Sequence, residues 1–141
     1  MSFQIVKREI NDIELHIYGK GKFEDYLKET IKQNNLSDSI FLHGPVVGAH
    51  DKLYESDCFV FPSWYEGFSG SLVEAMLSGI PIIASDIPAN LEAVTEDKTS
   101  LIFPVKDYLQ LADTMKSMIY NYESFLLLGK NARHEALSRF D

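Results

Sequence analysis

The sequence predicts an α/β fold, a doubly wound parallel sheet of about five strands with helices on both faces. Two observations predict it. Short β-branched and aromatic runs alternate with longer segments of helical period, and each short run is closed by Gly, Pro, Ser or His. The length of 141 residues favours a single domain with a core of its own.

The expected elements alternate along the chain. The strands are residues 14–18, 40–42, 58–61, 82–84 and 101–103, each short enough to be a buried parallel strand. Helices are expected at residues 23–34, 46–56, 70–78, 89–94, 108–120 and 124–139. Gly79 and Pro81 would end the third of these helices, and Asp107 would cap the fifth.

Residues 1–12 follow a different pattern. Phe3, Ile5, Val6 and Ile10 lie on one side of a helix, so the chain is expected to begin with a helix. A parallel α/β unit normally places a strand before such a helix. We therefore expect the sequence to start inside a domain whose first strand is missing.

The charge balance bears on the class of partner. The 13 basic and 21 acidic side chains give a net charge of −8, and no stretch gathers Lys and Arg with interleaved aromatics. A nucleic-acid partner is therefore not expected. A phosphate-bearing ligand stays open, because backbone amides at a helix N-terminus bind phosphate without cationic side chains.

Composition also bears on the compartment. Cys58 is the single cysteine, and we interpret it as a core thiol in a reducing, cytoplasmic compartment. No apolar stretch is long enough to span a bilayer, and the N-terminus lacks the apolar core of a signal peptide. His43 and His50 lack neighbours at metal-ligand spacing, so no metal site is expected.

The densest signal lies in residues 62–76, which read Pro-Ser-Trp-Tyr-Glu-Gly-Phe-Ser-Gly-Ser-Leu-Val-Glu-Ala-Met. This segment follows an expected strand and opens an expected helix, which places it at the carboxyl edge of the sheet, where ligands bind. Gly67 and Gly70 let the backbone approach a ligand, and Ser69 or Ser71 can cap the helix. The exposed amides and the helix dipole would form a site for a diphosphate.

Two carboxylates accompany this segment. Glu66 stands in the loop, and Glu74 lies about one turn into the helix. Carboxylates so placed can accept hydrogen bonds from the hydroxyls of one polyhydroxylated ligand. The alternative is that both face solvent. Against it, Glu74 has apolar neighbours on both sides, and an unpaired carboxylate is costly to bury, so we expect Glu74 to have a polar partner there.

The pattern Pro62-Ser-x-x-Glu66-Gly-Phe, followed by Glu74-Ala-Met-x-x-Gly79-x-Pro81, resembles the signature of the retaining group 1 glycosyltransferases of GT-B fold. The resemblance continues through residues 15–21, 40–44, 54–63 and 84–92, which are similar to the family's second strand with its Gly-x-Gly turn, its third strand, the approach to the donor loop and the segment after it. It implies a partial Rossmann-like C-terminal domain over residues 1–141, half of a GT-B fold, that binds a nucleotide sugar.

The resemblance also implies roles for single residues. Glu66 would be the catalytic-site residue that hydrogen-bonds hydroxyls of the donor sugar, and Glu74 would bind the nucleotide ribose. The other implied substrate-binding residues are Gly67, Phe68, Ser69 and Gly70 against the sugar and diphosphate, Gly44 and Pro45 against the base, Gly19 and Gly21 at an adjacent turn, and Glu92 near the donor pocket. The family more often has Gly where this chain has Ser69, and Glu92 fits a surface carboxylate equally well.

For function, the resemblance implies transfer of a sugar, with retention, from a nucleoside-diphosphate sugar to an acceptor saccharide or lipid. The usual roles of the family are in polysaccharide, lipopolysaccharide or glycolipid assembly. The nucleotide sugar is a co-substrate, and no cofactor is expected. Two alternatives stay open: a non-catalytic module that binds a nucleotide or a partner, and a dinucleotide-binding domain, which is weaker because Gly19 and Gly21 are not followed by a third Gly at Glu24.

Parts of the family pattern are absent. No residue matches the family's Gly-Arg pair and downstream Lys, which neutralise the donor diphosphate, and the N-terminal acceptor domain has no counterpart. Removing one such transition-state contact commonly costs about 3 kcal/mol, so we expect no turnover from this chain alone. In a sheet of order 3-2-1-4-5-6 the missing strand is the central one. We therefore expect strands 14–18 and 58–61 to close up, residues 1–12 to fill the slot, or a longer chain or dimer to complete the sheet.

Overall fold

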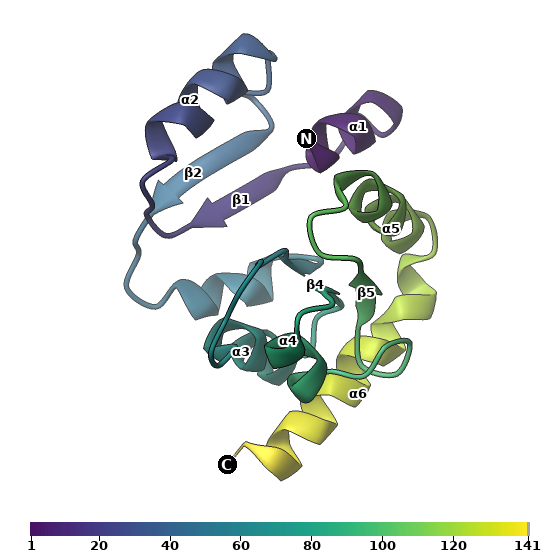
Figure 1. The fold of residues 1–141 in the computed structure, drawn as a ribbon. Coiled ribbons are helices and arrows are strands. Elements are labelled where there is room, and N and C mark those ends of the chain that lie inside the picture. The colour runs from purple at the N-terminus through teal and green to yellow at the C-terminus, as the bar shows by residue number, and fades with distance from the viewer. Residues whose placement is uncertain (141) are drawn as a thin grey trace. The chain divides into compact units, whose positions relative to one another are not determined.

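The computed structural model describes residues 1–140 and confirms the α/β class (Figure 1). The chain divides into two compact units, residues 1–49 and the residues from His50 onward. All strand pairs in both units are parallel. Each unit is described by itself below.

The first unit begins with helix α1 (Ser2–Glu9), as the sequence predicted. Strand β1 (Leu15–Tyr18), helix α2 (Glu24–Gln33) and strand β2 (Ile40–Gly44) follow. β1 pairs with β2 from Leu15 opposite Ile40, and the register shifts after Ile17 so that Tyr18 lies opposite Gly44. The two strands therefore end together, at an edge of the ladder where the chain turns after each strand.

Helix α2 differs from its prediction. The spacing of its apolar residues predicted a helix with one face buried on a sheet, but none of its residues is buried. Phe23, Tyr26 and Leu27 are 62%, 69% and 39% exposed. A ladder of only two strands offers too small an apolar surface to cover this face.

A 3-10 helix (Ala49–Glu55), which begins at the last residue of the first unit, leads into the second unit where a short α-helix was expected. Its strands are β3 (Phe59–Phe61), β4 (Ile82–Ser85) and β5 (Leu101–Phe103), paired in the order β3-β4-β5. The helices between and after them are α3 (Gly70–Ser78), α4 (Pro88–Ala93), α5 (Tyr108–Tyr120) and α6 (Tyr122–Arg139). All lie within one or two residues of the predicted ranges.

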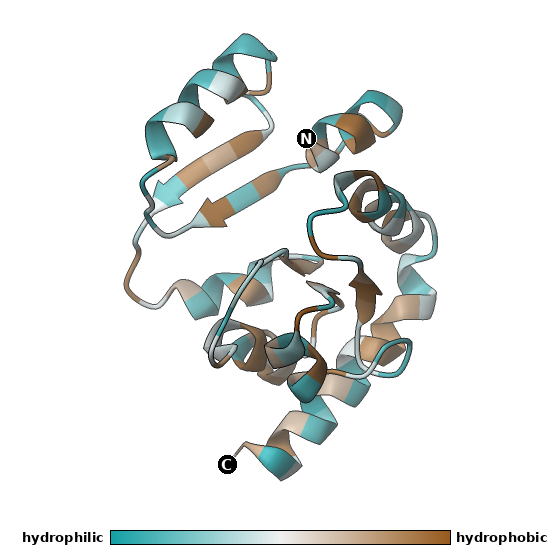
Figure 2. Ribbon diagram, viewed as in Figure 1, coloured by the Kyte–Doolittle hydropathy of each residue, from teal (hydrophilic) through white to brown (hydrophobic). Residues whose placement is uncertain are grey.

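The core of the second unit lies on both faces of the sheet. All four residues of the central strand β4 are buried, and alternate residues enter different clusters. Ile82 and Ala84 pack with α3 and the C-terminal half of α6, whereas Ile83 packs with β5, α5 and Leu128 of α6. Figure 2 shows β5 in the brown of apolar residues. Helices on both faces are the doubly wound arrangement that the sequence predicted.

The sheet pairing bears on the predicted missing strand. Among residues 1–140 the strands form two separate ladders, and no hydrogen-bonded pairing joins β1 to β3. These two strands belong to different units, so their closing up stays a prediction. Residues 1–12 do not fill the slot as a strand, because they carry helix α1. That a longer chain or a dimer completes the sheet stays a prediction.

Candidate functional site

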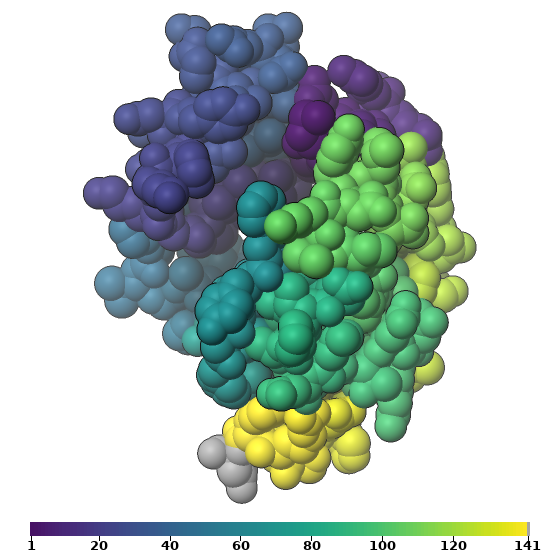
Figure 3. Space-filling view, in the orientation of Figure 1, coloured from purple at the N-terminus to yellow at the C-terminus, as the bar shows by residue number. Residues whose placement is uncertain are grey.

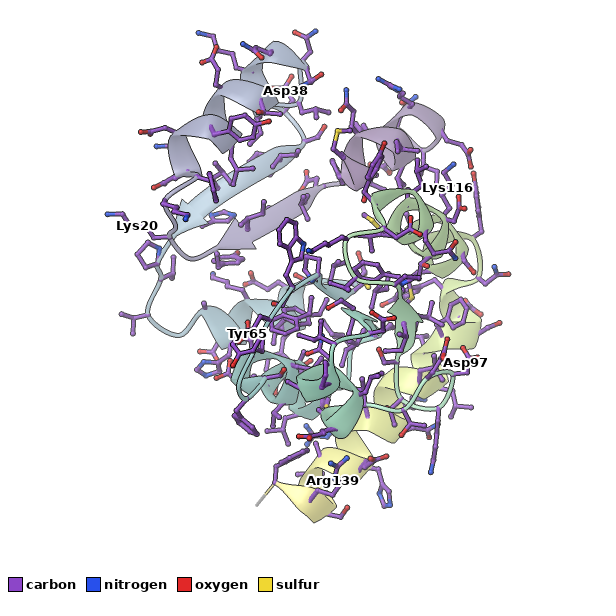
Figure 4. All side chains as sticks on the ribbon, in the orientation of Figure 1. Lys20, Asp38, Tyr65, Asp97, Lys116 and Arg139 are labelled. Atoms are coloured by element: carbon purple, nitrogen blue, oxygen red, sulfur yellow. The ribbon has the colours of Figure 1, made fainter. Side chains whose placement is uncertain are left out.

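The predicted donor loop, residues 62–69, connects β3 to α3 at the carboxyl edge of the second sheet. It contains no helix or strand, and most of its residues are exposed. Tyr65 is labelled in Figure 4 and is 85% exposed, and the space-filling view shows teal atoms of this region at the surface (Figure 3). The loop therefore lies where the sequence placed it, open to a ligand.

Glu66 is held from inside its own loop. The Ser63 hydroxyl donates a hydrogen bond of 3.1 Å to Glu66 Oε1. The carboxylate is half-buried, and no other bond to it is found in residues 1–140. A carboxylate fixed on one oxygen can accept hydrogen bonds from a ligand's hydroxyls with the other.

Ser69 occupies the N-cap position of α3 but does not cap the helix. Its side chain is 2% exposed, and its hydroxyl donates to Asn90 Oδ1 at 2.7 Å. The prediction that a serine caps α3 through its side chain is therefore wrong for Ser69, because its hydroxyl is held toward the buried side-chain amide of Asn90 and accepts from no amide of α3. The first-turn amides are left without a side-chain partner.

A buried chain of hydrogen bonds continues from Asn90. Its Nδ2 donates to Ser85 O at 3.0 Å and to Ser85 Oγ at 3.1 Å, and Ser85 Oγ donates to Ser63 O at 2.6 Å. Asn90 and Ser85 are both fully buried. These two residues, one on α4 and one at the end of β4, thus bind both ends of the loop, Ser63 and Ser69.

Sequence reasoning missed Ser85 and Asn90 as site residues. A sign was present, since Asn90 is the uncharged polar residue in the short segment Pro88–Ala93, and a polar side chain on the buried face of a helix needs partners. Which partners it takes depends on the return of the chain to the loop, and this is a tertiary contact.

The observed surroundings of Glu74 differ from the predicted ones. It is exposed, and no hydrogen bond or ion pair to its side chain is found in the described part of the chain. The buried residues of α3 are Leu72, Val73, Ala75 and Met76. At about 100° per residue these four share one face, and Glu74 lies opposite its centre. The expected polar partner for a buried Glu74 is therefore not needed.

The loop glycines are open rather than strained. A Cβ built on Gly67 or Gly70 would meet no atom within 4 Å, and neither residue has a positive φ. Their use would be to let a ligand approach the backbone closely. Phe68, between them, is 70% exposed.

The neighbouring loops of the same edge are tied together. Asp86, directly after β4, accepts from the Val105 amide at 2.8 Å. The next residue, Lys106, has φ 70°, a left-handed conformation that favours glycine, and its ammonium lies 4.7 Å from the centre of the Trp64 ring. Trp64 is 68% exposed, so cation–π contact rather than core packing accounts for its place.

The remaining predicted positions lie elsewhere. Glu92 is exposed on α4, and its backbone carbonyl accepts from Arg139, labelled in Figure 4, at 2.6 Å. In the first unit, Gly19 and Gly44 have φ 119° and 71°, and the Gly19 amide donates to Gly44 O at 2.9 Å. These two turns thus require glycine. Gly21 and Pro45 adjoin them at the ends of β1 and β2.

The described residues give no sign of a membrane-crossing helix or of a metal-binding cluster. No helix in residues 1–140 has the length and apolar character needed to cross a bilayer, and these residues hold no group of three His, Cys, Asp or Glu that could hold a metal ion.

Cys58 is half-buried beside β3, and burial raises the pKa of its thiol to about 12. A hollow of about 440 Å³ lies between α6 and Thr95–Lys98, and no predicted site residue lines it.

Comparison with known proteins gives a family match. Residues 2–135 match the sequence model of the family described as glycosyl transferases group 1. The chain is 28% identical, over 97% of its length, to the poly(ribitol-phosphate) alpha-N-acetylglucosaminyltransferase of Staphylococcus aureus. It is 27% identical, over 94% of its length, to the 2-deoxystreptamine N-acetyl-D-glucosaminyltransferase of Niallia circulans. The chain spans only 28% and 34% of these two relatives.

Two solved structures are similar along almost the whole chain. The S. aureus TarM mutant in complex with fondaparinux, alpha-GlcNAc-glycerol and UDP has a TM-score of 0.92 at 26% identity, with 99% of this chain and 29% of that chain covered. The C-terminal domain of LpcC, a group 1 family protein from Francisella tularensis, has a TM-score of 0.85 at 22% identity, with 99% and 76% covered. The second likeness concerns the fold alone.

Proposed function

The chain belongs to the group 1 glycosyltransferase family, and we propose that it is the nucleotide-sugar-binding part of the C-terminal domain of a GT-B enzyme. The enzyme would transfer a sugar from a nucleoside-diphosphate sugar to an acceptor saccharide or lipid. The observation that carries the proposal is the open loop 62–69, with the Glu66 carboxylate held by Ser63 at one end and uncapped helix amides at the other.

The relatives support the coarse activity and suggest the nucleotide. Both curated relatives are named as N-acetylglucosaminyltransferases, and the TarM structure holds UDP. We propose a uridine nucleotide as the first donor to test. Polysaccharide, lipopolysaccharide or glycolipid assembly remains the proposed setting, in a cytoplasmic compartment.

Different loop residues would contact different parts of the nucleotide-sugar donor. Glu66 would accept hydrogen bonds from sugar hydroxyls, and the amides of residues 67–70 would lie against the sugar and the diphosphate. The exposed first-turn amides of α3, with the positive end of the helix dipole, suit the negative charge of a diphosphate. Glu74, exposed on the next turn, is free to accept from ribose hydroxyls.

The proposed reaction breaks the bond between the sugar's anomeric carbon and the diphosphate oxygen. An acceptor oxygen bonds to the same carbon on the same face, its proton is released, and the nucleoside diphosphate departs. Charge develops on the departing diphosphate, so donors aimed at it act most strongly in the transition state. The cationic residues that would complete this contact, and the acceptor site, would belong to parts of a longer protein.

A binding panel tests the proposal. Residues 1–141 are titrated by calorimetry with UDP, GDP, ADP and one sugar conjugate of each, beside the variant Glu74→Ala. The proposal expects one nucleotide to bind more tightly than the others and Glu74→Ala to weaken it about tenfold, the loss of a hydrogen bond to a charged group. The matched control is Glu123→Ala, an exposed carboxylate on the first turn of α6. Equal or undetectable binding of all six ligands would remove the donor-site proposal for this chain.

A further inference from the structure

We propose that Asn90 is a positioning residue of the donor loop: it keeps Ser69 from capping helix α3 and so leaves the first-turn amides of Ser71 and Leu72 free for the donor diphosphate. The ligand in this statement rests on the proposed function. The structural part, that Asn90 diverts an N-cap, stands on hydrogen bonds within the second unit.

The direction of each hydrogen bond around Asn90 is fixed. Its amide group faces the carbonyl oxygen of Ser85 at 3.0 Å, and a carbonyl can only accept, so the Nδ2 side must point there. The Oδ1 side therefore faces Ser69 at 2.7 Å. An oxygen without a proton can only accept, so the Ser69 hydroxyl must donate its single proton to Asn90.

A hydroxyl that donates keeps its lone pairs, so the bond to Asn90 acts by fixing where the Ser69 oxygen points. Held toward Asn90, this oxygen accepts from no amide of α3, and the ordinary N-cap is absent. A serine at this position usually accepts from the amide two or three residues on, here Ser71 or Leu72. Ser69 makes no such bond, and in residues 1–140 no other side chain accepts from these two amides. Helix α5 of the same unit shows the usual arrangement, because the Asp107 carboxylate accepts from the Gln110 amide at 3.0 Å.

The same buried pair fixes the far end of the loop. Ser85 Oγ accepts from Asn90 and donates to the Ser63 carbonyl at 2.6 Å. Ser63 in turn donates to Glu66. Asn90 thus acts on both proposed contacts of the loop, the amides near Ser69 and the carboxylate of Glu66, without touching the ligand itself.

Amide hydrogen exchange tests the diverted cap without any ligand. In Asn90→Leu the Ser69 hydroxyl is released, and it is expected to cap α3. The Ser71 and Leu72 amides should then exchange roughly fivefold more slowly, the equilibrium factor of a typical N-cap. The double variant Asn90→Leu with Ser69→Ala should return them to the wild-type rate. The Gln110 amide serves as an internal reference in every sample.

A single variant covers the case in which Asn90→Leu fails to fold. Ser69→Ala deletes a hydroxyl that is not a cap, so the Ser71 and Leu72 amides should keep their wild-type exchange rates. Faster exchange of these amides in Ser69→Ala would overturn the inference. So would unchanged exchange in a folded Asn90→Leu. The matched control is Ser100→Ala, which removes another fully buried hydroxyl, bonded to Ile82 O at 3.2 Å, away from the loop.

A titration with UDP separates this inference from the proposed function. If the wild type binds UDP, Asn90→Leu should bind it five- to tenfold more weakly, and the double variant should return to within twofold of Ser69→Ala. UDP binding by the wild type with no loss in Asn90→Leu would overturn the positioning role alone. Absence of UDP, GDP and ADP binding by the wild type would overturn the diphosphate role together with the proposed function.

Discussion

The Ser63 hydroxyl donates a hydrogen bond of 3.1 Å to Glu66 Oε1, so the loop between β3 and α3 holds its own carboxylate in place. If Glu66 contacts the donor sugar, Glu66→Gln should weaken binding of a UDP-sugar by about tenfold or more while leaving UDP affinity within twofold. The reason is that a hydrogen bond to a charged acceptor contributes about 1.5–3 kcal/mol. Calorimetric titration of the wild type and the variant with the UDP-sugar and with UDP measures the ratio of the two affinities.

Two variants calibrate that experiment. Ser63→Ala frees the carboxylate without removing it, and it should change the ratio of the two affinities by less than Glu66→Gln does. Glu123→Gln changes an exposed carboxylate on α6 and should leave both affinities alone. An equal loss of UDP and UDP-sugar affinity in Glu66→Gln would contradict a sugar contact.

Residues 1–141 by themselves are expected to give no sugar transfer. No residue matches the family's Gly-Arg pair and downstream Lys, and each missing transition-state contact of this kind costs about 3 kcal/mol, more than a hundredfold in rate. The measurement is release of nucleoside diphosphate from several nucleotide sugars, with and without simple acceptors. Turnover above the level of a Glu66→Ala control would refute the prediction.

Gly129 of α6 lies against the end of helix α3, and its replacement by Ala should destabilise the second unit by about 1–3 kcal/mol or more. A Cβ on Gly129 would stand 2.3 Å from Gly79 O and 2.9 Å from the Ile80 carbonyl carbon, and backbone cannot yield cheaply. Urea unfolding should show a lower midpoint with an unchanged slope. Gly67→Ala is the control, because its Cβ meets nothing within 4 Å; an equal loss in both variants would exclude the contact as the cause.

Stability should fall at alkaline pH through Cys58. Burial, with Asp57 as a smaller cause, raises the pKa of this thiol from 9.0 to about 12. Between pH 9 and pH 12 the folded state keeps the thiol proton that the unfolded state loses. The contribution of Cys58 to the free energy of unfolding is therefore fully present below pH 9. It is lost between pH 9 and pH 12, at up to about 1.4 kcal/mol per pH unit.

The variant Cys58→Ala tests this origin. Its free energy of unfolding, measured from pH 8 to pH 11, should decline less steeply than that of the wild type. Some slope should remain, because burial also raises the pKa of the Tyr122 phenol and acts in the same direction. Identical slopes in the two proteins would show that the thiol does not carry the alkaline loss.

The elements with local signals were predictable. Asp107 accepts from Gln110 N as the capping rule requires, and Gly79 ends α3 with φ 81° in the left-handed conformation. Strands β3, β4 and β5 follow from short apolar runs bounded by turn residues. These features depend on interactions within a few residues, so the sequence contains what decides them.

Two expectations about helix α3 failed, the first for a tertiary reason and the second for a local one. The N-cap rule predicted that a serine would cap α3, but the Ser69 hydroxyl is held toward Asn90, 21 residues away, and accepts from no amide of α3. Apolar neighbours in sequence predicted a buried Glu74, although the helical period turns it away from the face that holds Leu72 and Met76. The second error was avoidable from periodicity, whereas the first was not.

The sequence by itself determined the α/β class and the family, and it predicted the loop between Pro62 and Gly70 as the place for a ligand, because periodicity, turn residues and motif spacing are properties of the chain order. Only the tertiary structure decided how that loop is held. Ser63, Ser69, Ser85 and Asn90 come together through burial at the edge of the sheet, where each polar group must find a partner, and the choice of partner depends on which elements meet there.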